Sequence, residues 1–243
     1  MEQIRLIIHD KLKYFIDPKW KNQSIEVMFS GKVTLKHILE SLGIPHPEVG
    51  VVKIGERNLG LSYYVQNEDI IEVFPFDPNL THIMPEKARF ILDNNLGKLN
   101  DYLRLLGFDA LYNHNWSDQL LAEQASSQDR ILLTRDRGLL KRKIVNLGYC
   151  VRSDLPRDQV EEVIHHFGLE RYINPYNRCV RCNGLLQQVE KQEIIDKLLP
   201  LTRLYYDEFT RCTDCGQIYW KGSHYDHMQE FMQKFHKDDP QEG

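Results

Sequence analysis

The sequence lacks long hydrophobic runs, and this absence excludes a membrane-spanning protein. None of its apolar stretches reaches the roughly 18 residues that a helix needs to cross a bilayer. The first residues, MEQIRLIIHDKLKYF, also lack the apolar core and the small-residue cleavage site of a secretory signal. We therefore expect a cytoplasmic protein that has no membrane partner.

The sequence also lacks an excess of basic residues. Its Lys and Arg number 31 against 35 Asp and Glu, which gives a formal net charge of -4. This charge provides no general attraction for nucleic acid, so any RNA binding must come from local basic patches. The remaining composition, 42% hydrophobic and 27% charged over 243 residues, is typical of a globular protein with a sizeable core.

Cysteine is scarce, and four of the five cysteines form two Cys-x-x-Cys motifs. The motifs are Cys179 with Cys182 and Cys212 with Cys215. Four thiolates suit tetrahedral Zn²⁺, and the short region around them has little core of its own, so bound metal would contribute to folding. We predict one structural zinc ion in a zinc ribbon over residues 174–236. A redox-active Cys-x-x-Cys motif and free thiols are the alternatives.

The N-terminal residues have the strand and helix order of a β-grasp domain. IRLIIH and IEVMF are candidate strands, TLKHILESLGI repeats its apolar residues at helical spacing up to Gly43, and GVVKIG and DIIEVFPF follow as strands. We predict this domain over residues 1–78, followed by a proline-marked linker over residues 79–86. The stretch resembles the ubiquitin-like sulfur carriers of thiamin and molybdopterin synthesis. Those carriers end in a free Gly-Gly, whereas this chain continues, so the resemblance favours a module that binds a protein partner or RNA.

Residues 87–173 alternate strand and helix patterns. ARFILD, FDALY, RILLT and YCVRS are candidate strands, and LGKLNDYLRLLG, SDQLLAEQAS, RGLLKRKIVNLG and DQVEEVIHHFG are candidate helices. This alternation predicts an α/β domain with a parallel sheet and helices on both faces. The polar residues 237–243 predict a disordered tail.

Four aspartates follow the predicted strands of this domain. Asp93 follows the apolar FIL, Asp136 follows ILLTR, Asp154 follows CVRS, and Asp118 begins the helix after the second strand. Sites in open α/β sheets lie outside the carboxyl ends of the strands, and carboxylates converging there suit Mg²⁺ or Mn²⁺.

Each aspartate also has a structural alternative. Asp118 is a plausible helix N-cap, Asp154 is suited to a turn before Leu-Pro, and Asp136 is next to arginines with which it could pair at the surface. Asp93 is hardest to explain in this way, because a carboxylate at the end of a buried strand needs a partner or an ion.

The central and C-terminal stretches resemble the PIN-like ribonuclease domain named after the C-terminal part of the Mut-seven exonuclease. The matching segments are FILDNNLGKLNDYLRLLGFDALY, SDQLLAEQA, RILLTRDRGLLKR, CVRC, CTDC and YWKGSH, in this order. Members of this family also carry a ubiquitin-like N-terminal domain. The resemblance implies a metal-dependent ribonuclease of PIN-like type that hydrolyses RNA phosphodiester bonds at an aspartate-bound Mg²⁺ or Mn²⁺ site.

Basic residues near the predicted acidic site are candidates for binding RNA, because an acidic metal pocket repels phosphate until cations attract the backbone. The alternative for these basic residues is that they only form a solvated helix face. The alternative function is a non-catalytic RNA- or ribosome-associated module that keeps the PIN scaffold. We expect single-stranded or structured RNA as the partner. The candidate RNA-binding residues are Lys98, Arg104, Arg135, Arg137, Lys141 and His224; the candidate catalytic residues are Asp93, Asp118, Asp136 and Asp154, of which the first three are the candidate Mg²⁺ or Mn²⁺ ligands.

Overall fold

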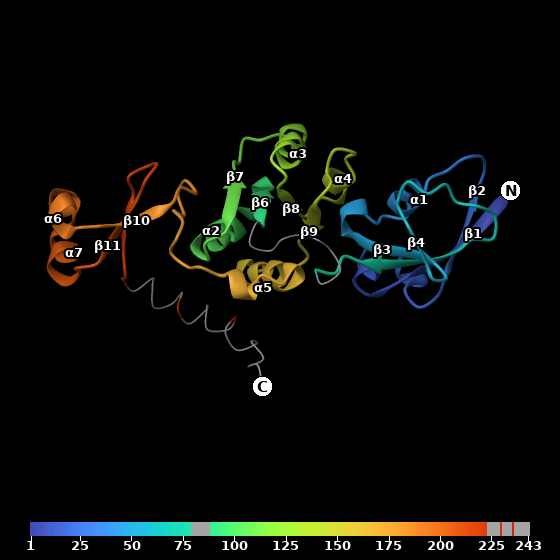
Figure 1. The fold of residues 1–243 in the computed structure, drawn as a ribbon, viewed down its shortest axis with the longest axis horizontal. Helices are drawn as coiled ribbons and strands as arrows, with labels where there is room; N and C mark the ends of the chain where they lie inside the picture. The colour runs from blue at the N-terminus through green and yellow to red at the C-terminus, as the bar shows by residue number, and fades with distance from the viewer. Residues whose placement is uncertain (79–87, 223–228, 230–234, 236–243) are drawn as a thin grey trace.

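The computed structural model describes residues 1–78 and 88–222, together with residues 229 and 235. The predicted linker, the predicted disordered tail and His224 lie outside the described residues. An N-terminal part (residues 1–78), a central part (residues 88–173) and a C-terminal part (residues 174–222) follow one another along the long axis (Figure 1). Among the described residues, every helix is too short or too polar to traverse a bilayer.

The N-terminal part contains a mixed five-stranded sheet with the order β2-β1-β5-β3-β4. The neighbours β1 and β5 are parallel, and the other pairs are antiparallel. The helix α1 packs the apolar side chains of Leu35, Ile38 and Leu39 into the core. This arrangement confirms the predicted β-grasp fold. Its elements are β1 (Glu2–Ile8), β2 (Ile25–Phe29), α1 (Leu35–Ser41), β3 (Val49–Ile54), β4 (Arg57–Leu59) and β5 (Ile70–Pro75).

Local sequence determines where α1 begins and ends. The Thr34 side chain accepts a hydrogen bond from the backbone N–H of His37, which satisfies one free donor of the first turn. The chain leaves the helix at Gly43, whose φ of +103° favours glycine, and a Cβ there would lie 2.7 Å from the carbonyl oxygen of Phe15. Gly43 therefore allows the end of α1 to lie against the segment that contains Phe15.

The central part is a four-stranded parallel sheet with the order β7-β6-β8-β9. Strands and helices alternate along the chain, and this confirms the predicted PIN-like parallel sheet. The elements are β6 (Arg89–Leu92), α2 (Gly97–Leu105), β7 (Asp109–Tyr112), α3 (Asp118–Ser127), β8 (Ile131–Thr134), α4 (Arg137–Leu140), β9 (Gly148–Cys150) and α5 (Pro156–Phe167).

The helix predicted over residues 137–148 is wrong in its length, because α4 ends at Leu140 and turns replace the rest. The β-branched Ile144 and Val145 disfavour a helix, and Val145 is instead fully buried. Gly148 begins β9 so close to α4 that a Cβ there would lie 2.6 Å from Leu140 Cδ2. The chain must therefore return to the sheet after one helical turn.

Two hydrophobic clusters cover the two faces of the parallel sheet. On one face, Phe90 and Leu92 pack with apolar residues of α2 and α5. On the other face, Ile91 and Leu132 belong to a cluster that contains residues of α3 and α4 and the whole core of the N-terminal part. Helices cover both faces as predicted, but the second face shares its core with the β-grasp domain.

A buried carboxylate joins the N-terminal and central parts. The side chain of Glu48, 2% exposed, accepts hydrogen bonds from the backbone N–H of Cys150 (2.6 Å) and from Arg152 Nη2 (2.9 Å). Burial raises the pKa of Glu48 to about 7, although Arg152, the N–H of Cys150 and Lys11 favour ionisation; Glu162 opposes it. Glu48 is therefore a titrating group inside the interface.

The C-terminal part is an antiparallel three-stranded sheet with the order β10-β11-β12. Its own core is small and consists of Ile194, Leu198 and Phe209 with a few half-buried neighbours. So small a core is consistent with a fold that depends on metal. The elements are β10 (Leu186–Val189), α6 (Lys191–Ile194), α7 (Pro200–Tyr205), β11 (Phe209–Cys212) and β12 (Ile218–Trp220).

The interface carboxylate generates a prediction about pH. The pKa of Glu48 lies above its usual value of 4.5, so its contribution to stability is fully present below that pH and is lost as the pH rises through about 7. Glu48→Gln removes this titration. We expect the free energy of unfolding of the variant to fall less than that of the wild type between about pH 5 and pH 8. Urea denaturation across this range measures the difference.

The matched control is Glu26→Gln, which changes a carboxylate that is 63% exposed and lies 3.6 Å from Arg5. This variant should keep the pH profile of the wild type. Identical profiles for the wild type and Glu48→Gln would show that Glu48 does not titrate in the interface.

Candidate metal centres

A hydroxyl group joins two aspartates at the carboxyl edge of the parallel sheet. Asp93 directly follows β6 and is 8% exposed. Thr134 ends the neighbouring strand β8, and its Oγ1 donates to Asp93 Oδ2 at 2.6 Å and accepts from the backbone N–H of Asp136 at 2.9 Å. The Thr134 hydroxyl therefore links the Asp93 carboxylate to the backbone of Asp136 at the ends of the two central strands.

The carboxylates of this pair keep acceptor capacity for a cation. Asp93 Oδ1 accepts from the N–H of Asn94, and Asp136 Oδ1 accepts from the N–H of Gly138. Within the described residues, Asp136 Oδ2 has no hydrogen bond. Each carboxylate oxygen has two lone pairs, so oxygen ligands of the kind that Mg²⁺ and Mn²⁺ prefer remain at this edge.

The other two predicted aspartates lie apart from this pair. Asp118 is exposed at the first turn of α3, and the N-cap of that helix is Ser117, whose Oγ accepts from the N–H of Leu120. The side chain of Asp154 is 83% exposed and accepts from Arg135 Nη2 at 2.5 Å. In the described part of the chain, no three carboxylates form a group of potential metal ligands.

The basic residues around the aspartate pair contact the N-terminal part. The guanidinium of Arg137 lies over the rings of Tyr14 and Phe15, at 4.9 Å and 5.1 Å from their centroids. Lys141 Nζ donates to the carbonyl oxygen of Glu40 at 2.8 Å. Both residues were predicted to bind RNA, and in this structure they bind the neighbouring domain.

Arg104 is a correction to the predicted RNA-binding residues. Its side chain is buried, and it donates to the carbonyl oxygens of Ala110 (2.8 Å) and Val180 (2.9 Å). Burial lowers the pKa of Arg104, and nearby acidic groups such as Asp101 partly offset this decrease. The side chain therefore joins α2 to the C-terminal part. In contrast, the side chain of Lys98 is 80% exposed, with its Nζ 3.9 Å from Asp101.

A cavity of about 490 Å³ opens beside the carboxyl edge. Lys98 comes from α2, Tyr112 from the end of β7, and Arg135 with Asp154 from the loops after β8 and β9. The other lining residues are Asn95, Gly97, Asp101, Pro156 and Gln159. The cavity therefore combines cationic, aromatic and hydrogen-bonding groups with the carboxylates of Asp101 and Asp154, and neither Asp93 nor Asp136 lines it.

Thr134 and Glu48 were not predicted from the sequence. Thr134 is fully buried, yet it is the one hydroxyl in the apolar strand ILLT and lies two residues before Asp136. That position is a usable signal, because a buried hydroxyl must find a partner. Glu48 gave no such signal, since its partners Cys150 and Arg152 are distant in sequence.

The four cysteines of the C-terminal part come together in space. Their sulfur atoms all lie within 4.8 Å of one another, with Cys179 3.6 Å from Cys215 and Cys182 3.4 Å from Cys212. A zinc ion with Zn–S bonds of ~2.3 Å in a tetrahedron requires sulfurs roughly 3.8 Å apart, so this set could bind one zinc ion.

Asp109, at the start of β7, holds the first cysteine motif against the central part. Asn183 donates from Nδ2 to Asp109 Oδ1 (2.8 Å), and its Oδ1 accepts from the backbone N–H of Ala110 (3.1 Å). Arg130 donates to both oxygens of Asp109. Burial alone would raise the pKa of Asp109, but the hydrogen bonds from Arg130 and Asn183 lower it overall. The loop that holds Cys179 and Cys182 is therefore fixed to the sheet.

The cysteine geometry predicts a structural zinc ion. Cys212→Ser removes one thiolate, and we expect the zinc content of the purified protein to fall from about one equivalent to near zero, with a lower melting temperature. Elemental analysis and thermal denaturation measure these quantities. The control Cys150→Ser changes a buried cysteine outside the cluster and should keep the zinc. A wild type without zinc, or a Cys212→Ser variant that retains it, would contradict the prediction.

Comparisons with known proteins agree with this architecture. Residues 88–232 match the family model described as Mut7-C RNAse domain, and residues 1–81 match the one described as Mut7-C ubiquitin. No curated protein and no solved structure matches the chain. The first match covers more than half of the 243 residues. The chain therefore belongs to the Mut7-C RNAse domain family and carries the Mut7-C ubiquitin-like domain at its N-terminal end.

Proposed function

We propose that this protein is a metal-dependent ribonuclease of PIN-like type, which hydrolyses RNA phosphodiester bonds at a Mg²⁺ or Mn²⁺ site. The observation that carries the proposal is the pair of Asp93 and Asp136, linked by the Thr134 hydroxyl at the carboxyl ends of adjacent strands. Ligand sites of open α/β sheets lie at this edge. Membership of an RNase family supports RNA as the substrate class.

The side chains of the pair have separate tasks in this proposal. Asp93 and Asp136 supply carboxylate oxygens to the ion, while Thr134 holds Asp93 Oδ2 and the backbone of Asp136 in place. A bound divalent ion supplies Lewis-acid chemistry that activates water and stabilises negative charge on the scissile phosphate. In this proposal Asp118, exposed at the first turn of α3, acts on the ion through water, as is common for Mg²⁺.

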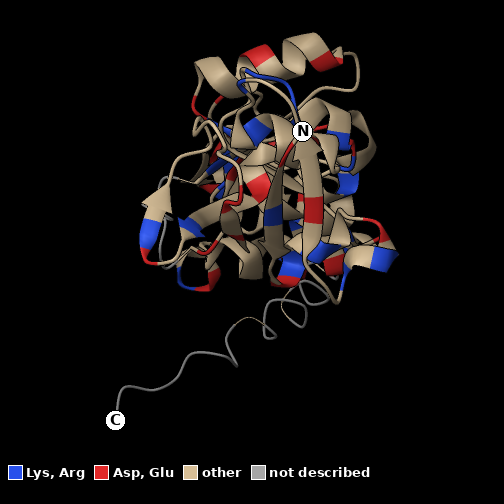
Figure 2. Cartoon of the chain, turned by 90° about the vertical axis from the view of Figure 1, so that its right-hand side faces the viewer, with Lys and Arg blue, Asp and Glu red and all other residues tan. Residues whose placement is uncertain are grey.

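In this proposal the RNA is attracted by side chains at the carboxyl edge of the sheet and not by the overall charge of the molecule. The view from the N-terminal end shows Lys and Arg interspersed with Asp and Glu (Figure 2). The cavity at the carboxyl edge of the sheet offers the exposed ammonium of Lys98, the guanidinium of Arg135 and the ring of Tyr112. Cations bind phosphate and aromatic rings stack on unpaired bases, so this lining suits single-stranded RNA.

The second candidate function is a non-catalytic RNA-binding module that keeps the PIN scaffold. One observation favours it: Asp118 and Asp154 stand apart from the aspartate pair, so the described residues contain no group of three carboxylate ligands. The two candidates differ in turnover, which the substitution of Asp136 tests.

We expect Asp136→Asn to abolish most RNA cleavage while RNA binding is kept. Asparagine is also a good N-cap, so α4 should remain intact, but the charge that holds the cation is lost. Cleavage in Mn²⁺ or Mg²⁺ should fall by a factor on the order of 100 or more, whereas RNA affinity holds or rises as repulsion of phosphate is relieved. Single-turnover cleavage of a labelled single-stranded RNA, with a chelator control, gives the rate.

The matched control is Asp129→Asn, an exposed aspartate that precedes β8 at the amino end of the sheet and whose positive φ asparagine tolerates. It should cleave like the wild type. Equal rates for the wild type and Asp136→Asn would place the activity elsewhere or in a contaminant. RNA binding without any metal-dependent cleavage by the wild type would favour the non-catalytic module.

A further inference from the structure

The short helix α4 depends on other parts of the molecule for its position. It contains the four residues Arg137–Leu140, and Asp136 is its N-cap. A single helical turn is unstable in isolation, because nucleation fixes several residues for very few hydrogen bonds. Its location relative to the sheet must therefore come from tertiary contacts.

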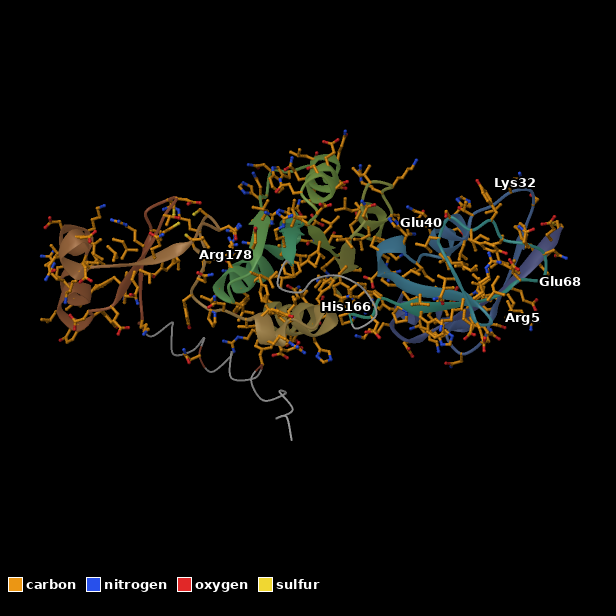
Figure 3. All side chains as sticks on the ribbon, viewed as in Figure 1. Arg5, Lys32, Glu40, Glu68, His166 and Arg178 are labelled. Carbon is orange, nitrogen blue, oxygen red and sulfur yellow. The ribbon has the colours of Figure 1, made fainter. Side chains whose placement is uncertain are left out.

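The ubiquitin-like domain contacts both ends of α4. At the first residue, Arg137 lies over the rings of Tyr14 and Phe15, and its Nη1 donates to the carbonyl oxygen of Phe15 at 3.4 Å. At the C-cap, Lys141 Nζ donates to the carbonyl oxygen of Glu40 at 2.8 Å. Glu40 lies on the side of its domain that faces α4 (Figure 3).

The same domain also holds the segment that follows α4. His46 Nε2 donates to the carbonyl oxygen of Val145 at 2.6 Å, and its Nδ1 lies 2.8 Å from Glu40 Oε1. Leu139, Leu140 and Val145 are buried in the hydrophobic cluster that includes the core of the ubiquitin-like domain. Polar and apolar contacts therefore fix one side of α4 to this domain.

The position of α4 determines where the Asp136 carboxylate points. The backbone of Asp136 is held by the Thr134 hydroxyl, but its side chain is oriented by the N–H of Gly138, which belongs to α4. A shift of α4 would move this N–H, and with it the Asp136 carboxylate, without breaking the strand β8. A displacement of about 1 Å matters in such a site, because ligands must stay close to 2.0–2.6 Å from the ion.

We propose that the ubiquitin-like domain is a positioning element of the aspartate site: it holds α4, and through the N–H of Gly138 in α4 it fixes the orientation of the Asp136 carboxylate. Tyr14, His46 and Glu40 are positioning residues in this scheme, and none of them touches the ion or the RNA. The inference rests on the proposed function, since it concerns the geometry of that metal site.

The test uses the full chain and the variant Tyr14→Ala. Tyr14 is 44% exposed, so its truncation should leave the core intact while it removes one ring from beneath Arg137. We expect faster hydrogen exchange of the α4 amides in the metal-free protein and about tenfold weaker Mn²⁺ binding, the size of a typical coupling between sites. The kcat for RNA cleavage should fall in parallel, with little change in KM.

Two further variants supply the rescue and the control. Tyr14→Phe keeps the ring and should behave as the wild type in exchange, Mn²⁺ affinity and kcat. Arg5→Ala removes an exposed side chain at the far end of the same domain (Figure 3), 3.6 Å from Glu26, and should change none of the three. If Tyr14→Ala failed to fold, His46→Ala would remove the contact to Val145 and take its place.

The outcomes separate this inference from the proposed function. Wild-type exchange at α4 together with wild-type Mn²⁺ affinity in Tyr14→Ala and His46→Ala would overturn the positioning role and leave the nuclease proposal untouched. A wild type that neither binds Mn²⁺ nor cleaves RNA would overturn the proposed function, and the positioning of a metal site with it. In that case faster exchange in Tyr14→Ala would still report the contact between α4 and the domain.

Discussion

A parallel sheet has two apolar faces, and the need to cover both governs this molecule. The helices α2 (Gly97–Leu105) and α5 (Pro156–Phe167) cover one face with their apolar sides. On the other face α4 has only the four residues Arg137–Leu140, so α3 and α4 cannot exclude water alone. The ubiquitin-like domain completes that face, and a single hydrophobic cluster runs through both. This contact is part of the core, which distinguishes it from the polar contacts of independent modules.

The same constraint explains the charges around the aspartate pair. A surface that joins two domains must satisfy its polar groups, and Arg137, Lys141 and Arg152 donate across it to carbonyl and carboxylate oxygens. The basic residues on the two sides of Asp136 in the sequence therefore have different partners. The half-buried Arg137 and Lys141 hold the domains together, while Arg135 remains at the edge of the cavity, paired with the exposed Asp154.

Local patterns in the sequence predicted the fold and part of the site. Strand patterns, helical spacing and Cys-x-x-Cys motifs each extend over only a few neighbouring residues. The β-grasp, the parallel sheet and the cysteine cluster could therefore be predicted from the sequence. The aspartates after the strands were predicted for the same reason. The contacts of Glu48, Arg104 and Arg137 could not be predicted, because each joins segments far apart in the chain. The length of α4 was also missed, since tertiary packing of Val145 overrides the helical spacing.

The two outer strands of the parallel sheet each donate a backbone hydrogen bond to a side chain of a flanking domain. Figure 1 shows β7 beside the C-terminal part and β9 beside the N-terminal part. At β7 the N–H of Ala110 donates to Asn183 Oδ1, and at β9 the N–H of Cys150 donates to Glu48 Oε1. Unpaired amides on an edge strand invite another strand to add, and a side-chain acceptor removes that opportunity. Glu48 therefore accepts a hydrogen bond from an amide of the edge strand β9, and the domain that carries Glu48 also holds α4. Protection of this strand edge and the orientation of Asp136 thus depend on the same interface.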